Sequence, residues 1–240
     1  MKKHQLIVVI FSLSLLFLLS CIFMGPAIRG EGDVTEETRK ITGFEKIEVS
    51  RGLEVYLVPD SQEYVLVEVD ENLHDIILTE LKNETLEIYT EKFIRSAQSR
   101  KVYVHFVHLR AVKSTSGAMV RSEGIVRSKR LEIAASAGSR QTLEVNAGEF
   151  DGRCSSGAQI MISGKAGIAE LKASSGAHLK GNGFIAAECS AKSSSGAHIW
   201  VGVKDKLEAE ASSGGQIYYS GDPGITNLDT SSGGAIRQEQ

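Results

Sequence analysis

The sequence predicts an all-β protein, a single-stranded parallel β-helix or β-solenoid with coils of about 19 residues. The first observation is a recurring Ser-Gly word, whose copies include "SSGAHL" and "SSGAHI". The glycine of this word returns at a nearly constant interval, which is typical of stacked supersecondary units. The seven glycines are Gly117, Gly138, Gly157, Gly176, Gly196, Gly214 and Gly233, and the copy at Gly138 is degenerate.

The second observation is an alternation of apolar and polar columns when the copies are aligned on this glycine, taken as position 0. Positions −5 and −3 are small or apolar, and positions −6 and −4 are polar and mostly charged. A period of two identifies a strand with one buried face, and its return in the same phase implies that each coil stacks on the last. Position −5 holds Val112, Ile133, Gly152, Leu171, Ala191, Ala209 and Leu228.

The alternation resumes after the glycine, where position +1 is small and position +3 is apolar in every copy except one. The exception is Gln141 of the degenerate copy. Serine hydroxyls can bond nearby backbone groups and glycine tolerates the left-handed conformation, so the Ser-Gly word is expected to form the corner of each coil. A sandwich of antiparallel hairpins is the alternative, but it would not place identical words in one column. We expect a right-handed coil, although periodicity alone does not fix the hand.

The repeats occupy residues 114–240, and residues 41–113 have a different pattern. Words such as "LEVYLV", "EYVLVEV" and "KVYVHFV" are longer alternating strands separated by "RG", "PDSQ" and "KNE" turns. This strand-rich part is expected either to form irregular first coils or to cap the open end of the stack. An uncapped end would expose an aggregation-prone strand edge.

The N-terminus has the layout of a lipoprotein signal peptide over residues 1–20. Two lysines precede an apolar run from Leu6 to Leu19, and "LLSC" ends at Cys21 as in the bacterial lipobox. Cys21 is therefore the expected lipidation site, and residues 21–40 the expected flexible tether. The expected location is the cell envelope, with the outer membrane as the anchoring membrane. The alternative is an ordinary cleaved signal with an incidental cysteine.

Charge and composition argue against several classes of function. The net charge of −3 is spread along the chain without a basic block, so no nucleic-acid partner is expected. Clustered acids on a β-helix could degrade polysaccharides, and position −6 holds Glu132, Asp151, Glu170 and Glu208. Position −4 offers basic residues beside them, which favours surface ion pairs over a catalytic carboxylate pair. We therefore expect no enzyme and no cofactor, and a polysaccharide lyase or hydrolase is the alternative.

Two outward columns carry the candidate binding residues. His178 and His198 share position +2, about 5 Å apart on adjacent coils, where a solvated polar ladder is favoured over a metal site because zinc needs three or four ligands. Trp200 and Tyr218 share position +4 and are expected to point outward, side by side. Such aromatic pairs can stack on sugar rings or anchor a protein partner. A covering role for the last coils is the alternative.

The two cysteines of the repeats are expected to be free. Cys154 stands at position −3 of one copy and Cys189 at position −7 of a copy two coils later. At about 4.8 Å per coil, the separation of the Cα atoms exceeds the limit of about 7 Å for a disulfide. Both are therefore predicted to be buried thiols that act as small apolar fillers.

The chain also resembles a known bacterial family, the "putative auto-transporter adhesin, head GIN domain" family. The resemblance runs from about Gly30 to the C-terminus. It depends on "GEGDVTEETRKITGFEKIEVSRGLEVYLV", "NETLEIY" and "KVYVHF" leading into serial "SSGA" copies behind a lipoprotein signal. It implies an all-β solenoid displayed on a cell envelope. The expected function is a non-catalytic adhesin or structural spacer, held to a membrane by its lipid, with a glycan or an envelope protein as possible partner.

Overall fold

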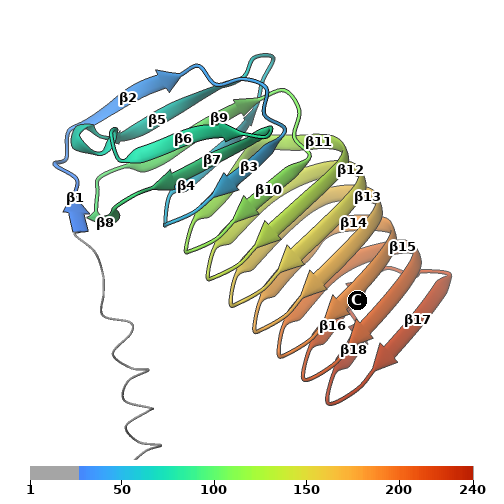
Figure 1. The fold of residues 1–240 in the computed structure, drawn as a ribbon. Helices are drawn as coiled ribbons and strands as arrows, with labels where there is room; N and C mark the ends of the chain where they lie inside the picture. Colours follow the sequence, from blue (N-terminus) through green and yellow to red (C-terminus); the bar gives the residue numbers. More distant parts are fainter. Residues whose placement is uncertain (1–26, 240) are drawn as a thin grey trace, which may run out of the picture.

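The computed structural model describes residues 27–239, which are nearly all β-structure. Apart from the strands, these residues contain one 3-10 turn, Glu71–Leu73. Within this range sixteen strands form one continuous sheet, and β1 with β8 forms a separate two-stranded sheet (Figure 1). The expected signal peptide, residues 1–20, and the expected lipidation site Cys21 lie outside the described residues.

Five long strands form the body of the solenoid and confirm the predicted fold. Each runs from one Ser-Gly corner to the next and pairs in parallel with its neighbours in sequence, so the hairpin alternative is wrong. Figure 1 shows the coils stacked along one axis. The strands are β11 (Met119–Ala135), β12 (Arg140–Cys154), β13 (Gln159–Ala173), β14 (His178–Ser193) and β15 (His198–Ala211).

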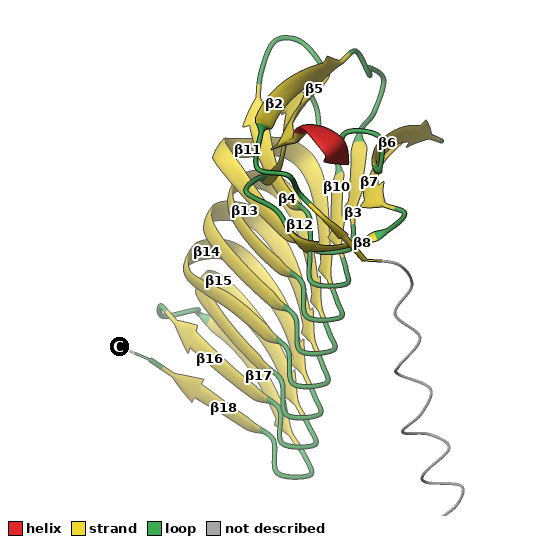
Figure 2. Ribbon diagram, turned by 90° about the vertical axis from the view of Figure 1, so that its left-hand side faces the viewer, coloured by secondary structure: helices red, strands yellow, loops and turns green. Residues whose placement is uncertain are grey.

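Every Ser-Gly word forms a tight turn, and these turns line one edge of the stack (Figure 2). In the copy at Gly176, Ser175 has φ 54° and the glycine has φ 68°, and Ala177 N–H donates to Ser174 O at 3.2 Å. Two successive left-handed residues define a type I′ turn. The serine at position −1 therefore adopts the left-handed conformation together with the glycine, which the sequence interpretation assigned to the glycine alone.

The inward columns are buried as predicted. Position +3, for example, is fully buried at Leu179 and Ile199, and position −3 at Ala211. The last coil differs, since Leu228 is 45% exposed. This coil contains β17 (Ile225–Thr230) and β18 (Ala235–Gln238), which pair on one side only, with β15 and with β16 (Gln216–Ser220).

The degenerate copy replaces apolar packing with a buried hydrogen-bond cluster. Gln141 is fully buried, and its Nε2 donates to Ala134 O at 2.8 Å and to Ser114 Oγ at 3.0 Å. Ser114 Oγ donates in turn to Ser139 Oγ at 2.9 Å, and Ser139 Oγ donates to the carbonyl oxygen of Ser114 at 2.9 Å. A serine one coil away thus satisfies the amide nitrogen of Gln141, whereas its Oε1 is buried without a hydrogen-bond partner among the described residues.

The stack also extends into the N-terminal part. β3 (Lys46–Val49) pairs in parallel with β10 (Ala111–Ser114), and β4 (Glu54–Pro59) pairs in parallel with β11. On the other side of this coil, β7 (Thr85–Thr90) pairs in parallel with β3, and β9 (Arg100–Phe106) with β4. Residues 41–113 therefore contribute coils, which is one of the two possibilities left open by the sequence.

Antiparallel strands supply the cap, which is the other possibility. β5 (Tyr64–Asp70) lies between β9 and β2 (Val34–Arg39), and β6 (Ile77–Lys82) pairs with β7. β1 (Ala27–Arg29) pairs with β8 (Phe93–Ser96) at the edge of this region. The expectation of a flexible tether over residues 21–40 is therefore wrong for the stretch that forms β1 and β2, because charged, threonine-rich strands can still pair at the edge of a sheet.

Candidate binding surface

The four candidate residues meet on one face of the last complete coils. Parallel pairing aligns His178 with His198, and Trp200 with Tyr218, as the column positions predict. They come from β14, β15 and β16, just after three successive Ser-Gly corners. Because each strand alternates inward and outward residues, positions +2 and +4 share the outer face. We call these four side chains the aromatic row.

The rings of the aromatic row are in mutual contact. The centroids of His178 and His198 are 5.1 Å apart with the planes at 72°, which agrees with the predicted spacing. Trp200 stacks on Tyr218 at 5.1 Å with an interplanar angle of 10°. His178 covers the indole at 6.2 Å and 20°, and His198 lies 5.5 Å from it. Four rings from three coils thus form one continuous cluster.

This stacking limits what the row can offer to a ligand. Trp200 and Tyr218 are half-buried rather than fully exposed, because each ring covers part of its neighbour. Sugar stacking requires a free ring face, whereas the indole has near-parallel neighbours in His178 and Tyr218. The row therefore presents ring edges and polar atoms, and the Tyr218 hydroxyl already donates to Gln216 Oε1.

The imidazole of His178 is uncharged and its ring nitrogen Nδ1 is enclosed. Burial, followed by the charges of His198 and Lys180, lowers the pKa of His178, which keeps this ring neutral at physiological pH. Its Nδ1 is buried without a hydrogen-bond partner among the described residues. Within residues 27–239 no group of three or more histidines, cysteines or acids is arranged to hold a metal ion.

A second aromatic pair lies in the same column at the opposite end of the stack. Tyr56 is aligned with Tyr103 and stacks on it at 5.0 Å and 22°. In the parallel pairing of β4 with β11, Tyr56 is also aligned with Arg121. Because Arg121 is at position +4 of its copy, Tyr56 occupies position +4 of an additional coil. The sequence interpretation missed this pair because it found no repeat before Gly117. Aligning the "RG" turn at Gly52 with the Ser-Gly words would have identified it.

The acids of position −6 are engaged by neighbouring bases. Asp151 accepts from Arg153 at 2.6 Å, and Glu170 pairs with Lys172, both within one strand. Lys192 pairs across strands with Glu210 at 2.7 Å. The expected ion pairs are therefore present, but most connect residues i and i+2 of one strand. The hydrogen bond and charge of Lys172 lower the pKa of Glu170, whereas a general acid needs a raised pKa.

The protein is therefore a parallel β-solenoid that carries a stacked aromatic row and surface acids in ion pairs with basic residues. The profile of the family described as "Putative auto-transporter adhesin, head GIN domain" matches residues 43–223, and the chain belongs to this family. Membership indicates a cell-surface or envelope protein. No helix in residues 27–239 is long and apolar enough to cross a membrane.

Solved structures share the fold at low sequence identity. A "putative adhesin" from Bacteroides fragilis is 17% identical, with a TM-score of 0.81 over 88% of this chain and 100% of that one. A "putative adhesin" from Parabacteroides merdae is 17% identical, with a TM-score of 0.68 over 90% of this chain and 100% of that one. A "Putative lipid binding protein" from Parabacteroides distasonis is 17% identical, with a TM-score of 0.71 and the same coverages. No curated protein matches the chain.

Proposed function

We propose that this protein is a non-catalytic adhesin, held in the cell envelope by a lipid on Cys21, and that the aromatic row is its binding surface. The observation that carries the proposal is the continuous contact of His178, His198, Trp200 and Tyr218 over three coils. Clusters of tryptophan and tyrosine are enriched at the energetic centres of binding surfaces. Family membership supports the adhesin class.

The geometry supports binding through ring edges. The indole N–H of Trp200 and the hydroxyl oxygen of Tyr218, as an acceptor, are hydrogen-bonding groups beside apolar carbon. A glycan with equatorial hydroxyls, or a flat envelope protein, can contact such a row without entering a pocket. The rigid stack of coils beneath holds the row in place, which limits the entropy lost on binding.

A glycan array probed with the full chain tests the binding surface. We expect Trp200→Ala and Tyr218→Ala each to abolish most of the bound signal. The matched control is Met161→Ala, since Met161 is a half-buried residue of the same column and lies outside the row. Equal loss in the control, or full retention in both row variants, would exclude the row as the glycan site. Crosslinking on cells with the same variants tests an envelope protein as partner.

Labelling with palmitate tests the anchor independently. We expect label on the wild-type protein and none on Cys21→Ala, because the thioether of this cysteine would carry the lipid. An unlabelled wild type would remove the anchor from the proposal without affecting the binding surface.

The absence of catalysis is supported by the engaged acids. Glu170 and Glu208 both have a lowered pKa because a lysine of the same strand donates to each. Neither group is suited to protonate a leaving group at neutral pH. Degradation of a polysaccharide panel by the protein, lost in Glu170→Gln, would contradict the non-catalytic function.

A further inference from the structure

A basic concave surface lies far from the aromatic row, at the start of the described chain. A cavity of about 530 Å³ opens between the Arg51–Gly52 corner and the segment that leads from β7 into β8. Its rim carries three cations and one acid, Glu91, together with the apolar ring of Phe93. The three cations are Arg51, Lys92 and Arg100.

The backbone of this region is held in place. Arg51 Nη1 donates to Thr90 O at 2.7 Å and to Glu91 O at 3.2 Å, which ties the segment to the first corner. Arg100 Nη1 lies 3.9 Å from the position that a Cβ would take on Gly52, so this guanidinium covers the glycine. Two guanidinium groups thus flank the cavity, and hydrogen bonds hold that of Arg51 in place.

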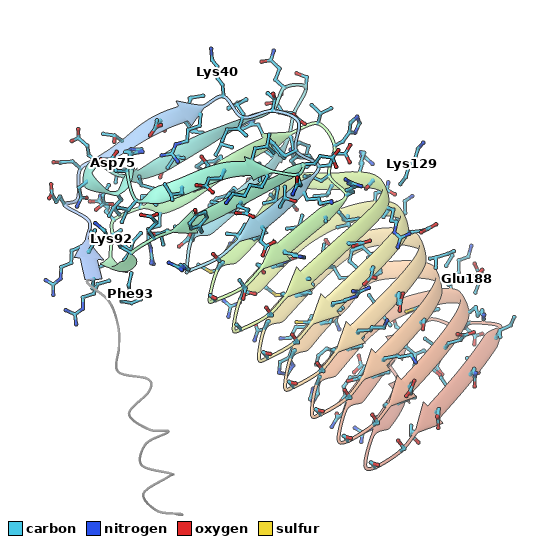
Figure 3. The ribbon with its side chains drawn as sticks, in the orientation of Figure 1. Lys40, Asp75, Lys92, Phe93, Lys129 and Glu188 are labelled. Carbon is cyan, nitrogen blue, oxygen red and sulfur yellow. The ribbon has the colours of Figure 1, made fainter. Side chains whose placement is uncertain are left out.

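Strands β1 and β8 extend the basic character beyond the cavity. In β8, Phe93 and Arg95 are exposed and Ile94 between them is buried, so both exposed side chains point away from the core. Phe93 is 50% exposed and lies in register with Ala27 of β1, whose last residue, Arg29, is also exposed. Figure 3 shows Lys92 and Phe93 together beside β1.

The cations of this surface have no acidic partners within residues 27–239. The structure gives no ion pair between any of them and another residue of the described range. This contrasts with the ion-paired columns of the solenoid and leaves the charges available for an anionic partner. The five basic residues are Arg29, Arg51, Lys92, Arg95 and Arg100, which we call the basic surface.

If Cys21 carries a lipid, the short stretch of chain between Cys21 and β1 keeps the basic surface close to the membrane. Ala27 is the sixth residue after Cys21 in the sequence. A chain of six residues spans at most about 22 Å. The lipid would therefore hold β1 and β8 within about that distance of the headgroups, whereas the aromatic row lies on the last coils of the stack (Figure 1).

We propose that the basic surface docks on anionic phospholipid headgroups, with the cavity receiving a headgroup phosphate and Phe93 entering the interface. This inference depends on the proposed lipid anchor for its orientation. A guanidinium group can donate two parallel N–H bonds to phosphate oxygens, and juxtamembrane cations are attracted to anionic lipid. An exposed aromatic ring beside cations is typical of proteins that lie on a membrane. The docked protein would direct the solenoid and its aromatic row away from the membrane.

A fluorophore on Ser96→Cys of the full-length protein, reconstituted with lipid vesicles, tests the docking. Ser96 is exposed on β8, and the control position is Lys129→Cys, exposed on the solenoid (Figure 3). Of the natural cysteines, Cys21 would be occupied by the proposed lipid. Cys154 and Cys189 are buried, and burial raises the pKa of each thiol to about 12, so neither should react at neutral pH. The vesicles contain two parts phosphatidylcholine to one part phosphatidylglycerol. We expect quenching by a lipid-borne quencher at position 96 and none at position 129.

Charge variants test which residues are responsible. Arg29→Gln, Lys92→Gln and Arg95→Gln combined should weaken binding to the anionic vesicles about a hundredfold, since each cation near the surface contributes roughly a factor of five and the three factors multiply. The matched control combines three exposed cations outside the surface and should retain the signal; these are Lys40→Gln, Arg127→Gln and Lys165→Gln. Equal quenching in pure phosphatidylcholine, or an unchanged signal in the Arg29, Lys92 and Arg95 variant, would overturn the proposal.

Two further experiments distinguish docking by the basic surface from the lipid anchor and from binding of free phosphate. Flotation with neutral vesicles tests the lipid anchor alone. If the protein does not float with neutral vesicles but still binds anionic vesicles, and the charge variants weaken that binding, the anchor proposal fails and the basic-surface proposal stands. Replacing chloride with inorganic phosphate at equal ionic strength should leave the quenching unchanged. Displacement by phosphate alone would assign the cavity to the free ion and overturn the membrane surface.

Discussion

The backbone N–H of Gly52 donates to the carbonyl oxygen of Ser116 at 3.1 Å, and Gly117 donates in the same way to Ala137 at 3.1 Å. The ladder of corner hydrogen bonds thus continues through a turn in which arginine replaces serine at position −1, while Ser50 keeps position −2. Arg51 has φ 59° and Gly52 has φ 71°, the same left-handed pair as in every Ser-Gly word. Two left-handed residues in succession, rather than a serine hydroxyl at position −1, define the corner.

This geometry predicts the effect of substitutions at position −1. Ser175 is exposed with φ 54°, so a substitution there changes the backbone preference and little else. Ser175→Val should destabilise the fold by about 1–2 kcal/mol, because a β-branched residue is disfavoured at positive φ. Ser175→Asn should be neutral or slightly stabilising, because Asn-Gly is the preferred type I′ pair.

Urea unfolding of the two variants measures this difference. Thr142→Val is a suitable control, since Thr142 is exposed within strand β12, where valine is favoured. If Ser175→Val is as stable as the control, the serine conformation is not a determinant of the corner.

The repeat columns made the fold predictable from sequence, but the corner at Gly52 was not recognised because an insertion separates it from the later repeats. Gly52 and Gly117 are far apart in the sequence, because strands β5 to β9 lie between them in the chain. A search for the constant period of the later repeats fails across such a gap. The column rule itself holds at this corner, since positions −5, −3, +1 and +3 are apolar and buried. These residues are Ile47, Val49, Leu53 and Val55.

The candidate surface was predictable only in part. Column positions bring His178 to His198 and Trp200 to Tyr218, because parallel strands in register align equal positions. Ring orientation depends on side-chain torsions, which a column does not specify. The coverage of the Trp200 faces therefore became apparent only in the structure.

The neighbours Ile199 and Trp200 provide a test of this inward and outward assignment. Ile199 is fully buried, so Ile199→Ala should cost about 2–5 kcal/mol of unfolding free energy. Trp200→Ala loses mainly its stacking with Tyr218 and should cost about 1 kcal/mol. Thermal or urea unfolding measures both variants. Equal destabilisation would show that the indole is part of the core and unsuited to be a ligand contact.

Asp70 predicts a specific dependence of stability on pH. This carboxylate is fully buried, and it accepts backbone N–H bonds from Gly32 at 2.9 Å, Gln98 at 2.9 Å and Ser99 at 3.0 Å. Burial raises its pKa, but the hydrogen bonds to the charged form outweigh this, and the net pKa is lowered. Asp70→Asn should destabilise the fold by about 1.5–3 kcal/mol, because an amide presents an N–H group to these donors.

The sign of the pH effect follows from the lowered pKa. A group with a lower pKa in the folded state stabilises the protein fully above its unfolded pKa, which is about 3.9 for aspartate. That contribution is lost as the pH falls through the folded pKa. The difference in unfolding free energy between wild type and Asp70→Asn should therefore be constant near pH 7 and shrink on acidification below about pH 4. A difference that grows on acidification would contradict the assignment.

The cysteines of the repeats provide the last prediction, which concerns the register of the whole stack. The structure has Cys154 and Cys189 as free, buried thiols, and parallel pairing places Cys154 beside Ala173 and Cys189 beside Ala169. Burial raises the pKa of both thiols to about 12, so the reactive thiolate is scarce at pH 8. Thiol reagents should leave both cysteines unmodified in the native protein and modify both after denaturation without reductant. A crosslinked Cys154–Cys189 peptide in mass spectrometry would require the coils that carry these cysteines to be out of register, and would contradict the stacking on which the aromatic row depends.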